Sequence, residues 1–281
     1  MLPSDKIRAR LVRRQFKESL SVGEFDLVRS ALLVAAVEQP NVNPGEYLEI
    51  VRDWGETVVE RAESRREPRL QVLLRFVHQE MGLRGNELAY YDPENSFLNR
   101  VLDRGLGIPI SLATVLISVG RHAGLQVNGV GMPGHFLVNV IEPGHADAVL
   151  IDPFRGERIN RADCQRKLDE LFDGRLELLD EHLSTVSDRQ ILERMLRNLK
   201  AVYLRYGLNR RALSVAERIL LVVPGSLSDI RDRGVLRVKL NDYAGAIADL
   251  EQCISSSADG PETAEVAEQI KAAKIGMAKL N

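Results

Sequence analysis

His135 and Asp152 are the residues of this chain best suited to acid–base chemistry. An imidazole whose second ring nitrogen is oriented by a carboxylate is the base of Cys–His–Asp and Ser–His–Asp sites. In the thiol enzymes the nucleophile is a cysteine at a helix N-terminus, where the dipole and a nearby imidazolium lower its pKa. The helix that precedes His135 is expected to start at Pro109, which supplies no thiol. The pair is therefore either the base of an altered site or a hydrogen bond that holds two strands together.

Two other side chains could replace the missing thiol. Ser111 is the nearest hydroxyl, but two residues along a helix correspond to a rotation of about 200°, so its side chain is expected to face away and to cap the first turn. Cys164 follows Asp163 on an early turn of another predicted helix, where a thiolate would be favoured. An isolated cysteine is also typical of a small core residue, and we expect Cys164 to be one.

Three polar residues precede the helix that begins at Pro109, namely Asn95, Asn99 and Asp103. Their amide and carboxylate groups either bind a ligand in a groove or satisfy backbone groups of the long connection from Tyr90 to Gly107. We expect neither a metal nor a cofactor, because the two cysteines are isolated and the other histidines lack ligand spacing. Those histidines are His78, His122, His145 and His182.

A helix over residues 109–123 and a small sheet should position these groups. The helix has almost no charge before Gly120, so it should be buried on all sides. Strands are predicted at residues 127–130, 135–141 and 149–151, and Pro143-Gly144 should turn the last two into an antiparallel pair. Asp163 is expected to cap a helix over residues 164–171.

Helices dominate the rest of the chain. Hydrophobic periodicity predicts three near the N-terminus: one that Pro40 closes, one that Pro44 opens, and one over residues 70–81. From about residue 188 the sequence becomes charged and amphipathic. A period of about 34 residues aligns Ala212 with Ala246 as small residues at close helix crossings, although Arg237 stands where the pattern wants an apolar residue. We expect an all-α repeat domain over 188–281 after a first domain over 1–187.

The composition of the chain limits the cellular compartment and the classes of binding partner that we expect. The chain has 281 residues, 44% of them hydrophobic, and a formal charge of −2, which gives no support for a nucleic-acid or anionic-membrane partner. Two cysteines, no apolar leader and no apolar run of membrane-spanning length favour a cytoplasmic protein. A basic run at the N-terminus is interpreted as a solvated helix face, with a partner-binding patch as the alternative. That run contains Lys6, Arg8, Arg10, Arg13, Arg14 and Lys17.

Several sequence blocks together resemble the transglutaminase-like superfamily, and most closely its bacterial SirB-type branch. The blocks are Tyr90-Tyr91-Asp92-Pro93, Asn95-Ser96-Phe97-Leu98-Asn99, Gly107-Ile108-Pro109-Ile110-Ser111-Leu112, Pro133-Gly134-His135-Phe136-Leu137-Val138, Ile151-Asp152-Pro153-Phe154, Arg194-Met195-Leu196-Arg197-Asn198-Leu199-Lys200 and Arg231-Asp232-Arg233-Gly234. The resemblance implies an α+β fold: N-terminal helices, a papain/transglutaminase-like core with a small antiparallel sheet, and tetratricopeptide-like repeats. In catalytic members a Cys starts the central helix, with Ala four and Arg twelve residues later. Counting back from Ala113 and Arg121 places Pro109 at the Cys position, while His135 and Asp152 match the other two catalytic positions.

Two functions follow from these observations. The first is a non-catalytic protein that binds a protein or peptide partner, because the nucleophile is missing and repeat surfaces usually bind peptides or proteins. The second is a hydrolase or acyl-transfer enzyme on peptide or protein substrates, in which His135 and Asp152 form a general-base pair. The oligomeric state, the partner and the pathway are not determined by the sequence.

Overall fold

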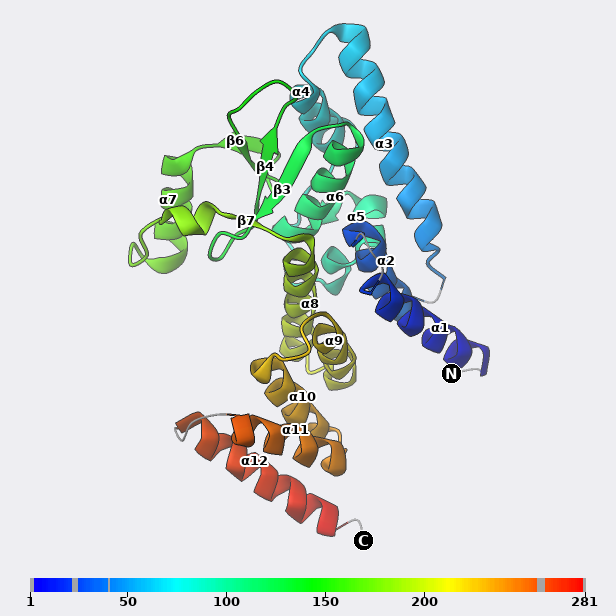
Figure 1. The fold of residues 1–281 in the computed structure, drawn as a ribbon, viewed down its shortest axis with the longest axis vertical. Helices are drawn as coiled ribbons and strands as arrows, with labels where there is room; N and C mark the ends of the chain where they lie inside the picture. The colour runs from blue at the N-terminus through cyan, green and yellow to red at the C-terminus, as the bar shows by residue number, and fades with distance from the viewer. Residues whose placement is uncertain (1–2, 22–24, 40, 257–260, 280–281) are drawn as a thin grey trace. The chain divides into compact units, whose positions relative to one another are not determined.

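The computed structural model describes residues 3–21, 25–39, 41–256 and 261–279 (Figure 1). The chain divides into two compact units, Met1–Leu192 and Glu193–Asn281. The boundary falls inside helix α8 (Asp188–Arg205). The domain bounds 1–187 and 188–281 that the sequence indicates stay a prediction. The α+β class is confirmed: helices surround a small antiparallel sheet in the first unit, and the second unit is helical.

Three helices begin the first unit: α1 (Pro3–Ser19), α2 (Leu27–Glu38) and α3 (Pro44–Arg65). The Asp26 side chain caps α2 by accepting a hydrogen bond from the Arg29 backbone N–H at 2.9 Å. The second and third helices start and end close to the predicted positions. The interpretation of the basic N-terminal run as one helix face is consistent with α1, although the side chain of Lys6 lies outside the described residues.

The third predicted helix, over residues 70–81, differs from the structure in its second half. Helix α4 (Arg69–Leu74) continues into a π-helical turn, η1 (Arg75–Glu80). In this turn the Met81 backbone N–H donates to the Phe76 carbonyl at 2.9 Å, one residue further back than in an α-helix. Hydrophobic periodicity does not distinguish an α-helical from a π-helical turn over so few residues, so the π-helical turn could not be predicted from it.

A short parallel ladder leads into the central helix. Strand β1 (Arg84–Gly85) pairs with β2 (Leu106–Gly107), and between them lie a 3₁₀ turn, η2 (Pro93–Ser96), and helix α5 (Leu98–Arg104). Helix α5 ends at Gly105, whose φ of +68° is a left-handed conformation that glycine adopts without strain.

Helix α6 (Pro109–His122) is buried from Pro109 to Gly120, as its lack of charge predicts. Pro109 occupies the first turn, where its missing N–H leaves no hydrogen bond unmade. At Gly120 the helix approaches the sheet so closely that a Cβ would lie 2.7 Å from the Val127 side chain.

The sheet has five strands in the order β6-β5-β4-β3-β7, all antiparallel to their neighbours. Helix α6 lies against one face, and helix α7 (Arg161–Phe172) covers the other (Figure 1). The antiparallel pair across Pro143-Gly144 is confirmed. The strands are β3 (Gln126–Val130), β4 (Leu137–Ile141), β5 (Val149–Asp152), β6 (Glu157–Ile159) and β7 (Thr185–Val186).

Two predictions in this region were wrong. His135 precedes β4, because its backbone N–H closes a turn onto the Met132 carbonyl at 3.1 Å. Asp163 does not cap α7; Asn160 does, accepting from the Asp163 N–H at 3.0 Å, while the Asp163 carboxylate accepts from the Asn160 N–H at 2.8 Å. This reciprocal capping box moves the start of the helix three residues toward the N-terminus.

The second unit consists of antiparallel helices around one apolar core. After α8 come α9 (Asn209–Val222), α10 (Leu227–Lys239), α11 (Tyr243–Ser256) and α12 (Pro261–Ala278). Ala212 and Ala246 are fully buried, and at Gly234 a Cβ would lie 2.8 Å from Leu250, so α10 and α11 pack closely there. Cys253 lies in the apolar core.

Arg237 is accommodated at an apolar position of the repeat because its side chain forms an ion pair. Its Nη1 lies 2.8 Å from Oδ2 of the buried Asp249 on α11, and Arg233 binds the same carboxylate with Nη2 at 2.6 Å from Oδ1. A buried carboxylate is stable only when it is paired. Arg237, at an apolar repeat position on α10, is therefore paired with Asp249 on α11.

A search for membrane-spanning helices over the described ranges found none with the length and apolarity that a bilayer requires.

Candidate functional site

His135 and Asp152 are brought together by the pairing of two strands. The register of β4 and β5 places Val138 opposite Ile151, so the residues just before β4 lie beside the end of β5. The tight turn before β4 then directs the ring toward the carboxylate, and His135 Nε2 lies 3.1 Å from Asp152 Oδ1. The two side chains are within hydrogen-bond distance, as the sequence indicated.

Asp152 is fully buried and is held by three groups. Besides His135, the Phe154 backbone N–H donates to Oδ1 at 2.9 Å, and Lys167 Nζ lies 2.8 Å from Oδ2. Burial alone raises the pKa of Asp152, but the hydrogen bonds and charges of His135 and Lys167 outweigh it and hold that pKa well below its usual range. The carboxylate is therefore ionised and is shared between an imidazole and an ammonium.

Lys167 is the residue that sequence reasoning missed. It lies on α7 next to the buried stripe that Cys164 and Leu168 form, and its side chain is 22% exposed. Its position beside that stripe was a usable signal, since a lysine there can extend its stem across the core and place its ammonium at the edge. What the sequence lacked was the pairing that brings β5 beneath α7.

Backbone contacts connect the start of α6 to the Asp152 carboxylate. Gly107, two residues before Pro109, pairs with Gly85 in the β1–β2 ladder. The Gly85 N–H donates to the Phe154 carbonyl at 2.9 Å, and Phe154 in turn donates to Asp152. Gly85 is required here because a Cβ would lie 2.3 Å from the Phe154 ring. Backbone hydrogen bonds and strand pairing thus join the start of α6, where Pro109 lies, to the buried carboxylate.

Ser111 and Asn95 lie together in a structural hydrogen-bond network. Both are fully buried, and Ser111 Oγ donates to the Asn95 carbonyl at 2.7 Å and accepts from the Ile108 N–H at 3.1 Å. The Asn95 side chain donates to the carbonyls of Ala89 and Tyr90 at 2.7 and 3.2 Å. Ser111 therefore caps the first turn of α6, and Asn95 satisfies backbone groups of the connection before it.

Asn99 and Asp103 lie in a different place. They face a pocket of about 290 Å³ between the end of α2, the start of α3 and α5, which Gln39 and Tyr47 also line. The structure therefore divides the sequence candidates into three groups: His135 with Asp152, Ser111 with Asn95, and Asn99 with Asp103.

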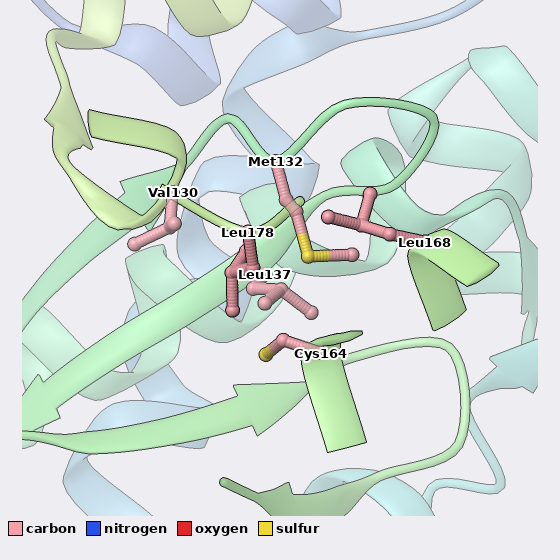
Figure 2. Close-up of a cluster of buried hydrophobic side chains, with 6 residues drawn as sticks. All are labelled: Val130, Met132, Leu137, Cys164, Leu168 and Leu178. Atoms are coloured by element: carbon pink, nitrogen blue, oxygen red, sulfur yellow. The ribbon is translucent and has the colours of Figure 1, made fainter. Parts of the chain in front are cut away.

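Cys164 is packed in the apolar cluster between the sheet and α7 (Figure 2). The residue is fully buried, and burial raises the pKa of its thiol, with the nearby Asp163 carboxylate adding to the effect. The expectation that an early helical turn favours a thiolate does not hold here, because desolvation of the charged form dominates. The other members of the cluster are Val130, Met132, Leu137, Leu168 and Leu178.

His78 is a further histidine near Asp152. Its Nδ1 lies 2.8 Å from the Leu83 carbonyl, and a Cβ at Gly156 would lie 2.4 Å from its ring. Burial lowers the pKa of His78, although the Leu83 hydrogen bond and the Asp152 charge oppose the shift. Within the described ranges, Nε2 is buried without a hydrogen-bond partner. A search of the same residues for groups of three or more His, Cys, Asp or Glu side chains able to hold a metal returned none.

Comparisons with known proteins agree with this architecture. A family model described as transglutaminase-like superfamily matches residues 46–197, and one described as tetratricopeptide repeat matches residues 199–271. A UPF0162 protein of Xylella fastidiosa is 37% identical over 234 residues, which cover 80% of this chain and 82% of the relative. A UPF0162 protein of Vibrio cholerae is 30% identical over 250 residues, covering 88% and 92%. Protein SirB1 of Salmonella typhimurium is 25% identical over 201 residues, covering 72% and 74%.

The transglutaminase-like match spans more than half of the chain, and the repeat match follows it directly. Bacterial relatives align with this chain along most of their own length. The chain belongs to the transglutaminase-like superfamily, as a SirB-type bacterial protein with C-terminal tetratricopeptide repeats.

Proposed function

We propose that this protein is a pseudoenzyme: a non-catalytic interaction protein that binds a protein or peptide partner. The observation that carries the proposal is that none of three candidate positions offers a nucleophile. Pro109 has no reactive group, and Ser111 and Cys164 are fully buried, with the Ser111 hydroxyl engaged in a cap and the Cys164 thiol packed in the core. Without a nucleophile the His135–Asp152 pair has nothing to activate by the superfamily's chemistry.

The surroundings of Asp152 support a structural role for the pair. A carboxylate that serves only to orient a catalytic imidazole has no need of a second cation. Here Lys167 lies 2.8 Å from the other carboxylate oxygen, and Asp152 itself is fully buried. The carboxylate, the ammonium and the imidazole, supplied by β5, α7 and the turn before β4, form a polar cluster that ties these elements together.

A groove in the second unit supports partner binding. It has a volume of about 280 Å³ and is lined by side chains of α8, α10 and α12. Leu204 and Val235 give it an apolar floor, and Arg231, Lys239 and Glu265 add charges of both signs. Tetratricopeptide repeats generally mediate protein–protein contacts, and a mixed apolar and charged groove suits an amphipathic peptide.

A pull-down from the native bacterium with two matched leucine variants tests this function. Leu204 lines the groove and is 39% exposed, whereas Leu221 on α9 is 38% exposed and does not line it. Leu204→Asp should abolish capture of the partner that wild type retains, and Leu221→Asp and His135→Ala should leave capture unchanged. Equal capture by all four proteins would place binding outside the groove.

The second candidate, a hydrolase or acyl-transfer enzyme, is favoured by one observation: the 3.1 Å contact between His135 and Asp152, with the His135 side chain 13% exposed. A screen on peptide, ester and amide substrates decides between the two functions. We expect no turnover from wild type. Turnover that disappears in His135→Ala would establish the enzyme and reject the pseudoenzyme.

We also propose a cytoplasmic location. Cys164 and Cys253 are both free thiols, each buried in its own core, which suits a reducing compartment. Fractionation of the native cells with an antibody to this protein tests the proposal, and recovery in the periplasmic or membrane fraction would contradict it.

A further inference from the structure

We propose that the pocket between α2, α3 and α5 binds a primary carboxamide, carried by a glutamine or asparagine side chain of a peptide. The pocket has a volume of about 290 Å³, and all of the residues that line it except Val42 carry a polar or charged group. That volume is at the lower end of small-ligand sites and suits a single amino-acid side chain. The site lies in the first unit and shares no residue with the groove of the repeats.

The base of the pocket is a pair of side-chain amides with unused hydrogen-bonding capacity. Asn99 is 2% exposed, and its Nδ2 donates to Gln39 Oε1 at 2.9 Å. Among the residues that the structure describes, Gln39 Nε2 and Asn99 Oδ1 are both buried and have no hydrogen-bond partner. Buried amide atoms in folded proteins are almost always paired, so one orphaned donor beside one orphaned acceptor points to a missing ligand.

One donor and one acceptor are left unused whichever way the two side-chain amides are oriented. If both side chains were flipped, Gln39 would donate to Asn99, leaving Gln39 Oε1 and Asn99 Nδ2 unused. One acceptor and one donor would again be left. The chemical requirement on a ligand is therefore the same in either case: it must offer both an acceptor and a donor.

The charges around the pocket favour a neutral ligand. Tyr47 donates its hydroxyl to Asp103, with both oxygens at 3.1 Å, and Arg100 Nη1 lies 3.5 Å from the same carboxylate. Arg100 also pairs with Glu94. Glu46, the other carboxylate that lines the pocket, accepts from Asn43 Nδ2 at 2.9 Å. Because each of these groups already has a partner, a charged ligand would gain little from them and would lose its hydration.

A primary carboxamide fits these requirements better than related groups. A carboxylate has no N–H donor, and an ammonium has no acceptor. A trans peptide unit has both, but its N–H and C=O point in opposite directions. In a primary carboxamide the carbonyl and one N–H lie on the same edge, so one small group can reach both orphaned atoms.

Binding can be measured on the full-length protein without its partner, so the result is independent of the proposed pseudoenzyme function. The probe is N-acetylglutamine N-methylamide, and the readout is the backbone amide NMR signals of the residues that line the pocket, which every variant retains. We expect saturable shifts with a dissociation constant of roughly a millimolar, given the size of the probe. The matching glutamate probe has the same shape without the donor and should bind about tenfold more weakly or worse.

A double variant separates binding from folding. Gln39→Met with Asn99→Leu replaces both members of the amide pair by apolar side chains of similar size, so the melting temperature should not fall while the probe shifts disappear. Gln71→Met makes the same change on an exposed glutamine of α4 and should leave binding intact. If the double variant does not fold, Gln39→Glu replaces the amide donor by a second, charged acceptor and should by itself weaken binding of the glutamine probe. The absence of saturable shifts, equal affinity for the glutamate probe, or undiminished binding by a folded variant would each overturn the proposal.

Discussion

Lys167 Nζ lies 2.8 Å from Asp152 Oδ2, on the opposite side of the carboxylate from the His135 ring. This contact distinguishes the His135–Asp152 pair from the His–Asp pair of a catalytic triad. In a triad the carboxylate orients the imidazole and stabilises the imidazolium that forms during the reaction. Here the Lys167 ammonium also neutralises the carboxylate, and this is the basis for proposing a structural role for the pair.

Replacement of Asp152 by asparagine should destabilise the protein by about 1–3 kcal/mol. The variant leaves the Lys167 ammonium without its counter-charge, and the partial exposure of Lys167 limits the loss because water can solvate it. Urea denaturation followed by circular dichroism measures the change. Asp180→Asn is the matched control, since the Asp180 side chain is 93% exposed and its loss should have no measurable effect. Equal stability of Asp152→Asn and wild type would mean that the cluster does not stabilise the fold.

The stabilisation by Asp152 should also depend on pH. Its pKa in the folded protein is held below the value of about 3.9 expected in the unfolded chain. The contribution is therefore fully present above about pH 5 and is lost as the pH falls through the lower, folded-state pKa. The stability difference between wild type and Asp152→Asn should therefore shrink as the pH falls below about 4. A difference that grows below about pH 4 would contradict the assigned direction of the shift.

Restoring a thiol at the start of α6 should not restore catalysis. Pro109→Cys should release no ammonia from a glutaminyl peptide, because position 109 is buried and Asp152 is neutralised by Lys167. Pro109→Ala is the matched variant without a thiol. Ammonia release above that background, measured with a coupled glutamate dehydrogenase assay, would show that only the nucleophile is missing from a working site.

The Arg237–Asp249 pair should be energetically coupled. Arg237→Leu restores the apolar residue that the repeat pattern prefers, yet it should cost about 1–3 kcal/mol because the buried Asp249 keeps only Arg233 as a partner. In an Asp249→Asn background the same change should cost less. A double-mutant cycle by chemical denaturation measures the coupling, expected at about 0.5–3 kcal/mol. Additive effects would mean that Arg237 acts through its aliphatic stem alone.

Overpacking at Ala246 tests the phase of the repeats. Ala246 is fully buried at a position reserved for a small residue, so Ala246→Leu should destabilise by about 1–3 kcal/mol. Ala248, two residues along the same helix, is exposed, and Ala248→Leu should be neutral. Thermal melts of both variants provide the comparison. A neutral result at Ala246 would show that the assigned period of about 34 residues is out of phase.

The sequence predicted those elements whose signals are local. The apolar run after Pro109 specified both the burial of α6 and its first residue, since proline is favoured only in the first turn. Pro143-Gly144 specified the turn between β4 and β5. This turn makes the two strands antiparallel and sets which of their residues pair. The proximity of His135 and Asp152 came from the resemblance to the family and is explained by the same register.

The features that the sequence did not reveal depend on residues far apart in the chain. Strand β7 has only two residues and forms because β3 offers it an edge, so it carries no periodicity of its own. Lys167 forms its ion pair because β5 places Asp152 beneath it. Arg237 forms its ion pair because the next helix supplies Asp249. Asn160 and Asp163 are equally good capping residues, and only the reciprocal hydrogen bonds decide which one is the cap.

The π-helical turn at Arg75–Glu80 has a consequence for how this chain can change in evolution. Such a turn holds one residue more than the α-helical turn it replaces, and each residue rotates a helix by about 100°. Loss of any one residue there would rotate the buried side of α4 out of the core or move His78 away from the Leu83 carbonyl. At this point selection acts on the number of residues as well as on their identity, so substitutions should accumulate here while insertions and deletions are purged.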